Sequence, residues 1–277
     1  MRPDFVIAQI SDFHIKAQGK LSYKKVDTLN ALKKCIHTLN QLTPRPNLVV
    51  MTGDLTDFGT TEEYAVLKDV ISELHMPWVA IPGNHDNPET FREAFSDESW
   101  LPPKSEFLSW SLSELPIHIV GLDSTVPFKP WGEICPKRMA WLDETLAQQP
   151  NKDTVVLLHH HPFQSGIAHM DKQNLRGIER LSKIIEKHKQ TKLILCGHLH
   201  RFVTTQLAGA TVCSAPGTSH QVAPDFRKNA PAHFNLEPAG MLLHHWYKNI
   251  GFTTHYLNIG HQGRTYPFYD ENGLLID

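Results

Sequence analysis

Five short blocks of the sequence carry side chains that commonly bind metal ions. Imidazole nitrogens and carboxylate oxygens together suit Mn, Fe, Zn and Co. Two such ions about 3.5–4 Å apart can acidify a water molecule and neutralise the charge that develops on a phosphate during hydrolysis. The blocks therefore predict a binuclear metal centre that hydrolyses phosphoesters. They are Asp12-Phe13-His14, Gly53-Asp54, Gly83-Asn84-His85-Asp86, His160-His161-Pro162 and Gly197-His198-Leu199-His200.

No block is specific by itself. The second and third blocks contain residues that favour ordinary turns, and the three consecutive histidines from His159 to His161 could form a surface tract. The last block is the strongest, because His198 and His200 follow an apolar strand and alternate residues there face the same side. All five blocks occur together, each after an apolar run, and this joint pattern favours a metal site over a chance scatter of histidines.

Apolar runs that suit buried strands alternate with helical patterns through the first two-thirds of the chain. We expect strands at residues 5–10, 48–51, 78–81, 115–122, 154–158 and 192–196, and helices at residues 26–42, 61–74, 136–147 and 178–187. This alternation predicts an α/β layered fold. The metal-binding blocks follow the strands, and the carboxyl ends of strands are where ligands collect in open α/β sheets.

The pattern changes after His200. Short strands are expected at residues 203–207, 210–213, 241–246 and 252–257, a loop-rich segment separates them at residues 215–239, and no helical pattern remains. We interpret this tract as a second sheet that completes a sandwich, with a projecting element that covers the site or pairs subunits. The predicted organisation is a single domain over residues 1–277, with a metal-site core at 1–200 and second-sheet strands and cap or tail elements at 201–277.

Composition limits the classes of partner. The chain has 277 residues, with 27 Lys and Arg against 29 Asp and Glu, so its formal net charge is only −2. This balance argues against a nucleic-acid binder, which needs concentrated positive charge. No apolar run reaches the roughly 18 residues of a membrane span and no signal peptide is visible. Four cysteines without a C-x-x-C pair suit a reducing compartment, so we expect a cytoplasmic protein without a membrane partner.

The five blocks resemble the pattern of the calcineurin-like metallophosphoesterase superfamily, which is D-x-H, G-D, G-N-H-D/E, H and G-H-x-H. The ending Asn84-His85-Asp86 and the form Gly53-Asp54-Leu55-Thr56-Asp57 are similar to class III cyclic-nucleotide phosphodiesterases and GpdQ-type glycerophosphodiesterases, and differ from serine/threonine phosphatases. Residues 62–64, 216–222 and 269–272 extend the likeness to the glycerophosphodiesterases. The resemblance implies a four-layer αββα sandwich with C-terminal β-rich cap or oligomerisation elements, and homo-oligomers that are dimers or larger.

The resemblance also implies a role for each candidate residue. Asp54 would bridge two divalent or trivalent ions (Fe, Mn, Zn or Co), and three residues of the pocket would contact the substrate in addition to Asn84 and His85. Among the consecutive histidines, His160 fits the register of the family, and strand alternation would turn its two neighbours away. One metal would take Asp12, His14, Asp54 and His200, the other Asp54, Asn84, His160 and His198, and the pocket would include Tyr23, His220 and a hydroxyl of Ser124 or Thr125.

The expected activity is the hydrolysis of small phosphodiesters by a metal-bound hydroxide, with Asp54, His85 and His220 as the catalytic residues. His85 would steady the developing charge, and His220 or water would protonate the leaving alcohol. Glycerophosphodiesters are the favoured substrates, and 3′,5′-cyclic nucleotides such as cyclic AMP are the alternative. A nuclease is disfavoured by the near-neutral charge, and a non-catalytic scaffold is disfavoured because all the ligand positions are filled.

Overall fold

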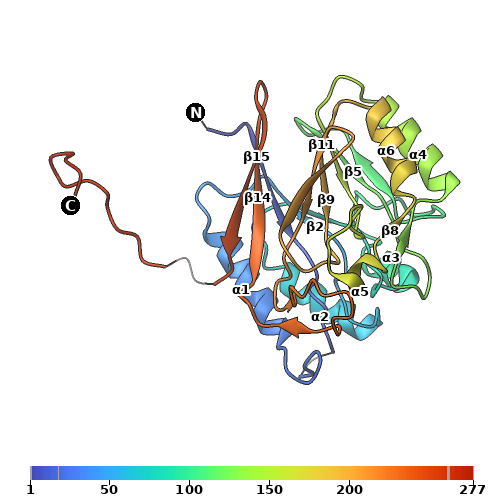
Figure 1. Ribbon diagram of the computed structural model, residues 1–277, viewed down its shortest axis with the longest axis horizontal. Coiled ribbons are helices and arrows are strands. Elements are labelled where there is room, and N and C mark those ends of the chain that lie inside the picture. The colour runs from blue at the N-terminus through green and yellow to red at the C-terminus, as the bar shows by residue number, and fades with distance from the viewer. Residues whose placement is uncertain (1, 18, 261–262, 277) are drawn as a thin grey trace.

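Two mixed β-sheets face each other in the computed structural model, which describes residues 2–17, 19–260 and 263–276 (Figure 1). The first sheet has the order β15 (Gly251–Asn258), β14 (Gly240–Tyr247), β1 (Phe5–Ile10), β2 (Leu48–Met51) and β3 (Trp78–Ala80). The second has the order β10 (Val203–Leu207), β11 (Ala210–Ser214), β9 (Thr191–Cys196), β7 (Thr154–Leu157), β5 (His118–Gly121) and β4 (Trp110–Leu112). Two short pairs complete the strands: β6 (Gly132–Glu133) with β8 (Leu175–Arg176), and β12 (Gln221–Val222) with β13 (Phe234–Asn235).

The helices begin where the local sequence provides caps. Thr60 and Glu63 form a capping box at the start of α2, and Pro136 occupies the first turn of α4. Within the described residues, no helix is long and apolar enough to cross a membrane. The helices are α1 (Thr28–Gln41), α2 (Thr61–Ile71), α3 (Pro88–Ala94), α4 (Pro136–Ala147), α5 (Ala168–Asp171) and α6 (Ile178–Lys187).

The side chains of β7 show how the layers are built. Val155 and Leu157 belong to the core cluster that also contains β1, β2, α1 and α2, whereas Val156 and Leu158 pack with α4 and α6. Successive strand residues point to opposite faces, so the second sheet is buried on both sides. Helices therefore lie outside both sheets (Figure 1), which confirms the predicted α/β sandwich.

Buried polar contacts hold the two sheets in register with each other. Gln9 of β1 donates from Nε2 to the carbonyl of Cys196 in β9 at 2.9 Å and to Thr52 Oγ1 at 3.1 Å. Trp110 of β4 donates from Nε1 to the carbonyl of Ala80 in β3 at 2.8 Å. Unpaired buried polar groups are costly, so these bonds favour one alignment of the sheets. As a result, the carboxyl ends of the central parallel strands of both sheets lie together.

The strands after residue 200 do not form a separate second sheet, which corrects our interpretation of that tract. β11 pairs in parallel with β9, and β10 pairs with β11, so both extend the second sheet. β14 pairs antiparallel with β1, with Phe5 opposite Trp246, so the last hairpin extends the first sheet. No helix occurs among the described residues after 200, as expected. Residues 263–276 run away from the body of the molecule (Figure 1), and their role as a cap or oligomerisation element stays a prediction.

Candidate metal centre

The loops that follow β1, β2 and β9 hold their candidate ligands in an unusual backbone conformation. Non-glycine residues seldom adopt positive φ, and each such residue costs on the order of 1–3 kcal/mol. Five candidate ligands share this conformation, so the strain is concentrated in the segments that the sequence singled out. They are Asp12 (φ 57°), His14 (47°), Asp54 (50°), His198 (66°) and His200 (50°).

One group of ligand atoms comes from the ends of β1, β2 and β9. His14 Nε2 lies 3.1 Å from His200 Nε2 and 3.6 Å from Asp54 Oδ2. His200 Nε2 lies 3.4 Å from Asp12 Oδ1. All four side chains are buried, and one ligand atom from each lies within 4.8 Å of the others. The structure therefore brings together the four residues predicted to hold the first metal.

A second group meets the first at Asp54, and two neighbouring histidines are candidates for it. His159 Nε2 lies 3.2 Å from Asn84 Oδ1 and 3.3 Å from Asp54 Oδ2. His160 Nδ1 forms a 2.8 Å hydrogen bond with Ser124 Oγ, and its Nε2 is buried without a partner among the described residues. The imidazole that faces Asn84 and Asp54 in this structure is His159, and the assignment of this position to His160 stays a prediction. His198 completes the group, with its ring centroid 5.1 Å from that of His159.

The direction of the His159 ring has a local cause. β7 ends at Leu157, so the alternation of side chains along a pleated strand does not extend to the three histidines. His159 Nδ1 hydrogen-bonds to the carbonyl of Thr52 at 2.7 Å, which turns Nε2 toward Asp54. Gly53, at φ 94°, leaves room for this ring, because a Cβ there would lie 2.5 Å from His159 Nδ1.

Asp54 lies between the two groups of candidate ligands. Its Oδ2 faces His14 and His159, and its Oδ1 accepts a 2.9 Å hydrogen bond from the backbone N–H of His85. Gly83 permits this approach, because a Cβ at that position would lie 2.2 Å from the carboxylate. Burial opposes ionisation of Asp54, but the His159 and His85 rings outweigh it and hold its pKa well below the usual value.

The pKa values of the donor set shift in both directions. Burial lowers the pKa of His200 to about 3, which keeps its imidazole neutral, and metals bind neutral imidazole. Burial also opposes protonation of His159 and His14, but the neighbouring carboxylates outweigh it and raise the pKa of His159 to about 9 and that of His14 above its usual value; a bound cation would displace these protons.

His14 Nε2 and His200 Nε2, 3.1 Å apart, can share only one proton, so a cation between them would satisfy both nitrogens. His198 Nε2 is also buried without a partner among the described residues. Burial raises the pKa of Asp12 to about 6, with Asp54 adding to the effect, so a cation would also favour its charged form.

A cavity of about 260 Å³ opens onto these ligands. It is bounded by Tyr23 and His220, whose ring centroids are 5.4 Å apart, and the His220 ring lies 4.6 Å from that of His200. Both predicted pocket residues therefore lie beside the metal ligands. Three further residues of the lining were not among the predicted site residues: His169, His233 and Phe234.

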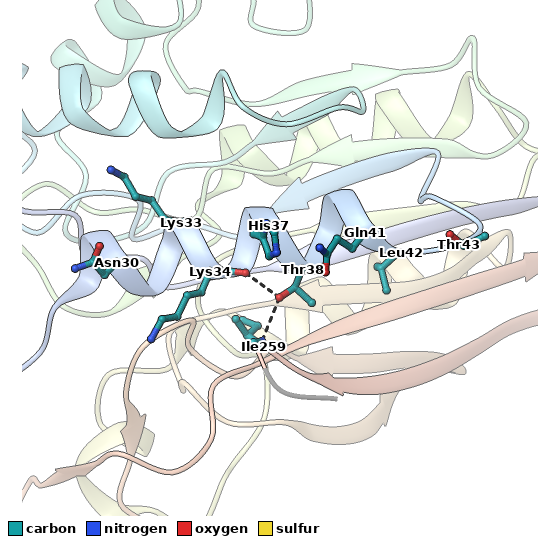
Figure 2. A pocket seen from close by; sticks show the side chains of 10 residues that line it. Asn30, Lys33, Lys34, His37, Thr38, Gln41, Leu42, Thr43 and Ile259 are labelled. Carbon is teal, nitrogen blue, oxygen red and sulfur yellow. Dashed lines mark hydrogen bonds between the residues drawn. The ribbon is translucent and has the colours of Figure 1, made fainter. Parts of the chain in front are cut away.

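The two hydroxyl side chains after β5, Ser124 and Thr125, differ in their access to the cavities. Ser124 is fully buried against His160, and its assignment to substrate binding stays a prediction. Thr125 lines a neighbouring cavity together with Asn84, although its Oγ1 donates to Asp123 Oδ1 at 2.7 Å. A larger cavity of about 930 Å³ lies elsewhere, along α1 and against Ile259 (Figure 2). It shares no residue with the metal centre.

Asp57 is a residue of the site that the motif pattern did not assign. Its Oδ1 lies 3.4 Å from His14 Nδ1, the nitrogen that faces away from the ligand group, and its Oδ2 accepts a hydrogen bond from Lys16. Burial opposes its ionisation, but the nearby His14 ring and Lys16 lower its pKa to about 2. A carboxylate behind a ligating histidine fixes the tautomer and the orientation of the ring.

We expect Asp57→Asn to weaken metal binding by roughly 10–100-fold, because it removes the charge that orients His14. Competition with a chromogenic chelator measures the affinity directly. Asp270→Asn, which changes an exposed carboxylate of the tail, is the matched control. Equal metal affinity in the Asp57 variant and the control would show that the contact has no role in metal binding.

Two facing sheets with buried histidine and aspartate groups at their carboxyl edges are the architecture of a metallophosphoesterase. Residues 5–202 match the family described as Calcineurin-like phosphoesterase. The chain belongs to this family, as its motifs indicated, and it is a phosphoester hydrolase.

Similar proteins cover most of the chain. The probable glycerophosphodiester phosphodiesterase GpdQ of Arcobacter nitrofigilis is 44% identical over 273 residues, which are 98% of this chain and 100% of that protein. The 3′,5′-cyclic adenosine monophosphate phosphodiesterase CpdA of Escherichia coli K12 is 30% identical over 79% of this chain and 78% of that protein. A dimetal phosphatase from Danio rerio has a TM-score of 0.66 at 14% identity, with 93% of this chain and 99% of that chain covered. This last likeness supports the fold alone.

Proposed function

We infer that this protein is a binuclear-metal phosphodiesterase that acts on small diesters, with glycerophosphodiesters as the preferred substrates. The observation that carries this inference is the position of Asp54 Oδ2, 3.6 Å from His14 Nε2 and 3.3 Å from His159 Nε2. One carboxylate oxygen thereby faces two groups of candidate ligands. The likeness along nearly the whole chain to a protein named a probable glycerophosphodiester phosphodiesterase supports the substrate class.

Each group of ligands would hold one of the two ions. Bound Fe, Mn, Zn or Co would polarise the phosphate oxygens and lower the pKa of water toward about 7. The buried setting excludes bulk water, which strengthens electrostatic interactions with the substrate. In this proposal Asp12, His14, Asp54 and His200 hold one ion, and Asp54, Asn84, His159 and His198 hold the other.

The exposure of His85 supports a role for it in contacting the substrate phosphate. Its side chain is 36% exposed and lines the cavity beside Asn84. Its Nδ1 donates to the carbonyl of Asp57 at 2.8 Å. Nε2 can therefore donate a second hydrogen bond to a phosphate oxygen only when the ring is the imidazolium form. A charged His85 would stabilise the negative phosphate as charge builds during attack.

His220 and Tyr23 form the side of the pocket where an alcohol group of the diester would lie. The His220 ring is buried between Tyr23, His200 and Phe234. Ser219 Oγ lies 2.9 Å from His220 Nδ1 and fixes the ring. Burial lowers the pKa of His220 to about 2, with His200 and His14 adding to the effect, so the ring is neutral. Its Nε2 can hydrogen-bond to the departing alcohol, and water is the proton donor.

Two further proposals concern the oligomeric state and the cellular compartment of the enzyme. A homo-oligomer is supported by residues 263–276, which run away from the body and expose Tyr266, Phe268 and Leu275. Large exposed apolar side chains gathered in one segment are typical of interaction sites. Action in the cytoplasm stays a prediction from the composition of the chain.

A substrate panel tests the proposed function. We expect metal-loaded enzyme to hydrolyse glycerophosphoethanolamine and glycerophosphocholine with a kcat/KM at least about ten times that for cyclic AMP, a difference of about 1.4 kcal/mol in transition-state binding. The phosphomonoester glycerol 3-phosphate should be the poorest substrate. A preference for cyclic AMP would favour the second candidate, which the likeness to the Escherichia coli enzyme supports. A preference for the monoester would contradict a diesterase.

A further inference from the structure

A second cavity lies on the other side of His85 and Asn84. It has a volume of about 420 Å³, within the range of roughly 300–1,000 Å³ that is usual for small-molecule sites. Asn84 and His85 line both this cavity and the one that contains His220. A phosphodiester has two ester substituents. With its phosphate at His85, the two substituents can occupy the two cavities.

Two exposed phenyl rings line the second cavity. Phe58 is 70% exposed and Phe128 is 100% exposed. Leaving a phenylalanine side chain in water forgoes about 1.5–3 kcal/mol of burial. Phe128 also has a φ of 61°, a strained conformation for a bulky residue. Single exposed apolar residues are common, but here two rings stand at one cavity together with Pro127 and Pro130.

The positive charges around these rings disfavour a cationic substituent. Lys16 Nζ lies 4.0 Å from the centroid of the Phe58 ring, and Lys129 lines the cavity. The two carboxylates of the lining are already engaged. Asp57 is paired with Lys16. Asp86 is buried and accepts hydrogen bonds from Leu55, Thr56, Tyr64 and Gly83.

No carboxylate among the described lining residues is therefore left to pair with an ammonium group such as that of choline or ethanolamine. An uncharged planar ring fits the cavity better than an ammonium group does. It can stack on the phenyl faces and needs no carboxylate to pair with. The lysines would be compatible with the negative phosphate to which such a ring is attached.

We propose that the cavity formed by Phe58 and Phe128 binds a planar aromatic substituent of a phosphodiester, an aryl group or a nucleobase, while the phosphate lies at His85 and the metal ligands. This inference rests on the proposed diesterase function and adds a class of substrate to it. The reaction is ordinary hydrolysis: a P–O bond forms to water, one ester P–O bond breaks, and the leaving alcohol takes the proton. The ring stays in its subsite as part of the product or of the leaving group.

The test compares two diesters in the metal-loaded, full-length enzyme. Thymidine 5′-(p-nitrophenyl) phosphate carries rings, whereas glycerophosphoethanolamine carries none. Stacking on one aromatic side chain contributes about 1–3 kcal/mol, which is about a 5–150-fold effect on binding. We expect the double variant Phe58→Ala/Phe128→Ala to raise KM for the thymidine diester at least tenfold and to change kcat/KM for glycerophosphoethanolamine less than twofold. Phe128→Trp should restore much of the binding.

Phe202→Ala, which removes a partly exposed ring that does not line this cavity, is the matched control. The dissociation constant of the monoester p-nitrophenyl phosphate, measured by calorimetry, gives a readout that does not need turnover and should rise in the double variant. An unchanged KM for the thymidine diester, or equal losses for both diesters, would overturn the subsite. Ring-dependent turnover without any hydrolysis of glycerophosphoethanolamine would instead support the subsite and contradict the proposed glycerophosphodiesterase function.

Discussion

Asp54→Ala should lose at least one of the two metals and lower kcat/KM by roughly 1000-fold or more. Its Oδ2 is the oxygen that faces both His14 and His159. Without it, each group of ligands loses a negative charge. Metal analysis by mass spectrometry and initial rates on bis(p-nitrophenyl) phosphate measure the two effects.

Two comparisons make the Asp54 result specific. Asp54→Asn keeps the size of the side chain and the hydrogen bond from His85 N–H, but not the charge, so it should also lose metal. Asp270→Ala changes an exposed carboxylate in the tail and should leave metal content and rate unchanged. An Asp54→Ala enzyme that held two metals and kept its rate after removal and reloading of metal would refute a bridging role.

His159→Ala and His160→Ala should differ clearly in metal content and in rate. We expect His159→Ala to lose the second metal and about 100–1000-fold in kcat/KM, because Nε2 of His159 faces Asn84 and Asp54. His160→Ala should keep two metals and fall about tenfold at most, since its contact with Ser124 lies behind the ligands. Metal content per chain and steady-state rates on the same diester distinguish the variants.

His160 is the alternative ligand at this position. His160 Nε2 is buried without a partner among the described residues, and one ligand atom of His160 can approach those of His159 and His198. If His160→Ala lost the metal while His159→Ala kept it, the ligand would be His160, as the sequence register implied. Thermal unfolding of both variants with metal present shows whether either change merely disrupts the fold.

Much of the architecture could be predicted because strand ends and ligands coincide in the sequence. The apolar runs at residues 5–10, 48–51 and 154–158 match β1, β2 and β7 closely, and the helices at 136–147 and 178–187 match α4 and α6. Asp12, Asp54 and His198 follow parallel strands, so their approach at one edge follows from strand polarity. The positions of these strands and helices, and the shared edge of their ligands, can therefore be predicted from local sequence patterns.

Two features could not be predicted from local patterns. They are the pairing of distant strands and the choice of histidine ring that faces Asn84 and Asp54. β14 joins β1 across more than 200 residues, and nothing in its own sequence names that partner. His159 lies beyond the end of β7, where its direction depends on a hydrogen bond to Thr52 from another strand end. The exposed rings of Phe58 and Phe128 carry no periodic signal, and only the fold brings them to one cavity.

The central claim is that two metal ions share Asp54 and that both are needed for diester hydrolysis. The most direct measurement is a titration of metal-free enzyme with Mn or Zn, followed simultaneously by metal content per chain and by the rate on bis(p-nitrophenyl) phosphate. The predicted result is full activity at two ions per chain and loss of activity on chelation. Full activity at one ion per chain, or activity that persists after chelation, would contradict the binuclear centre.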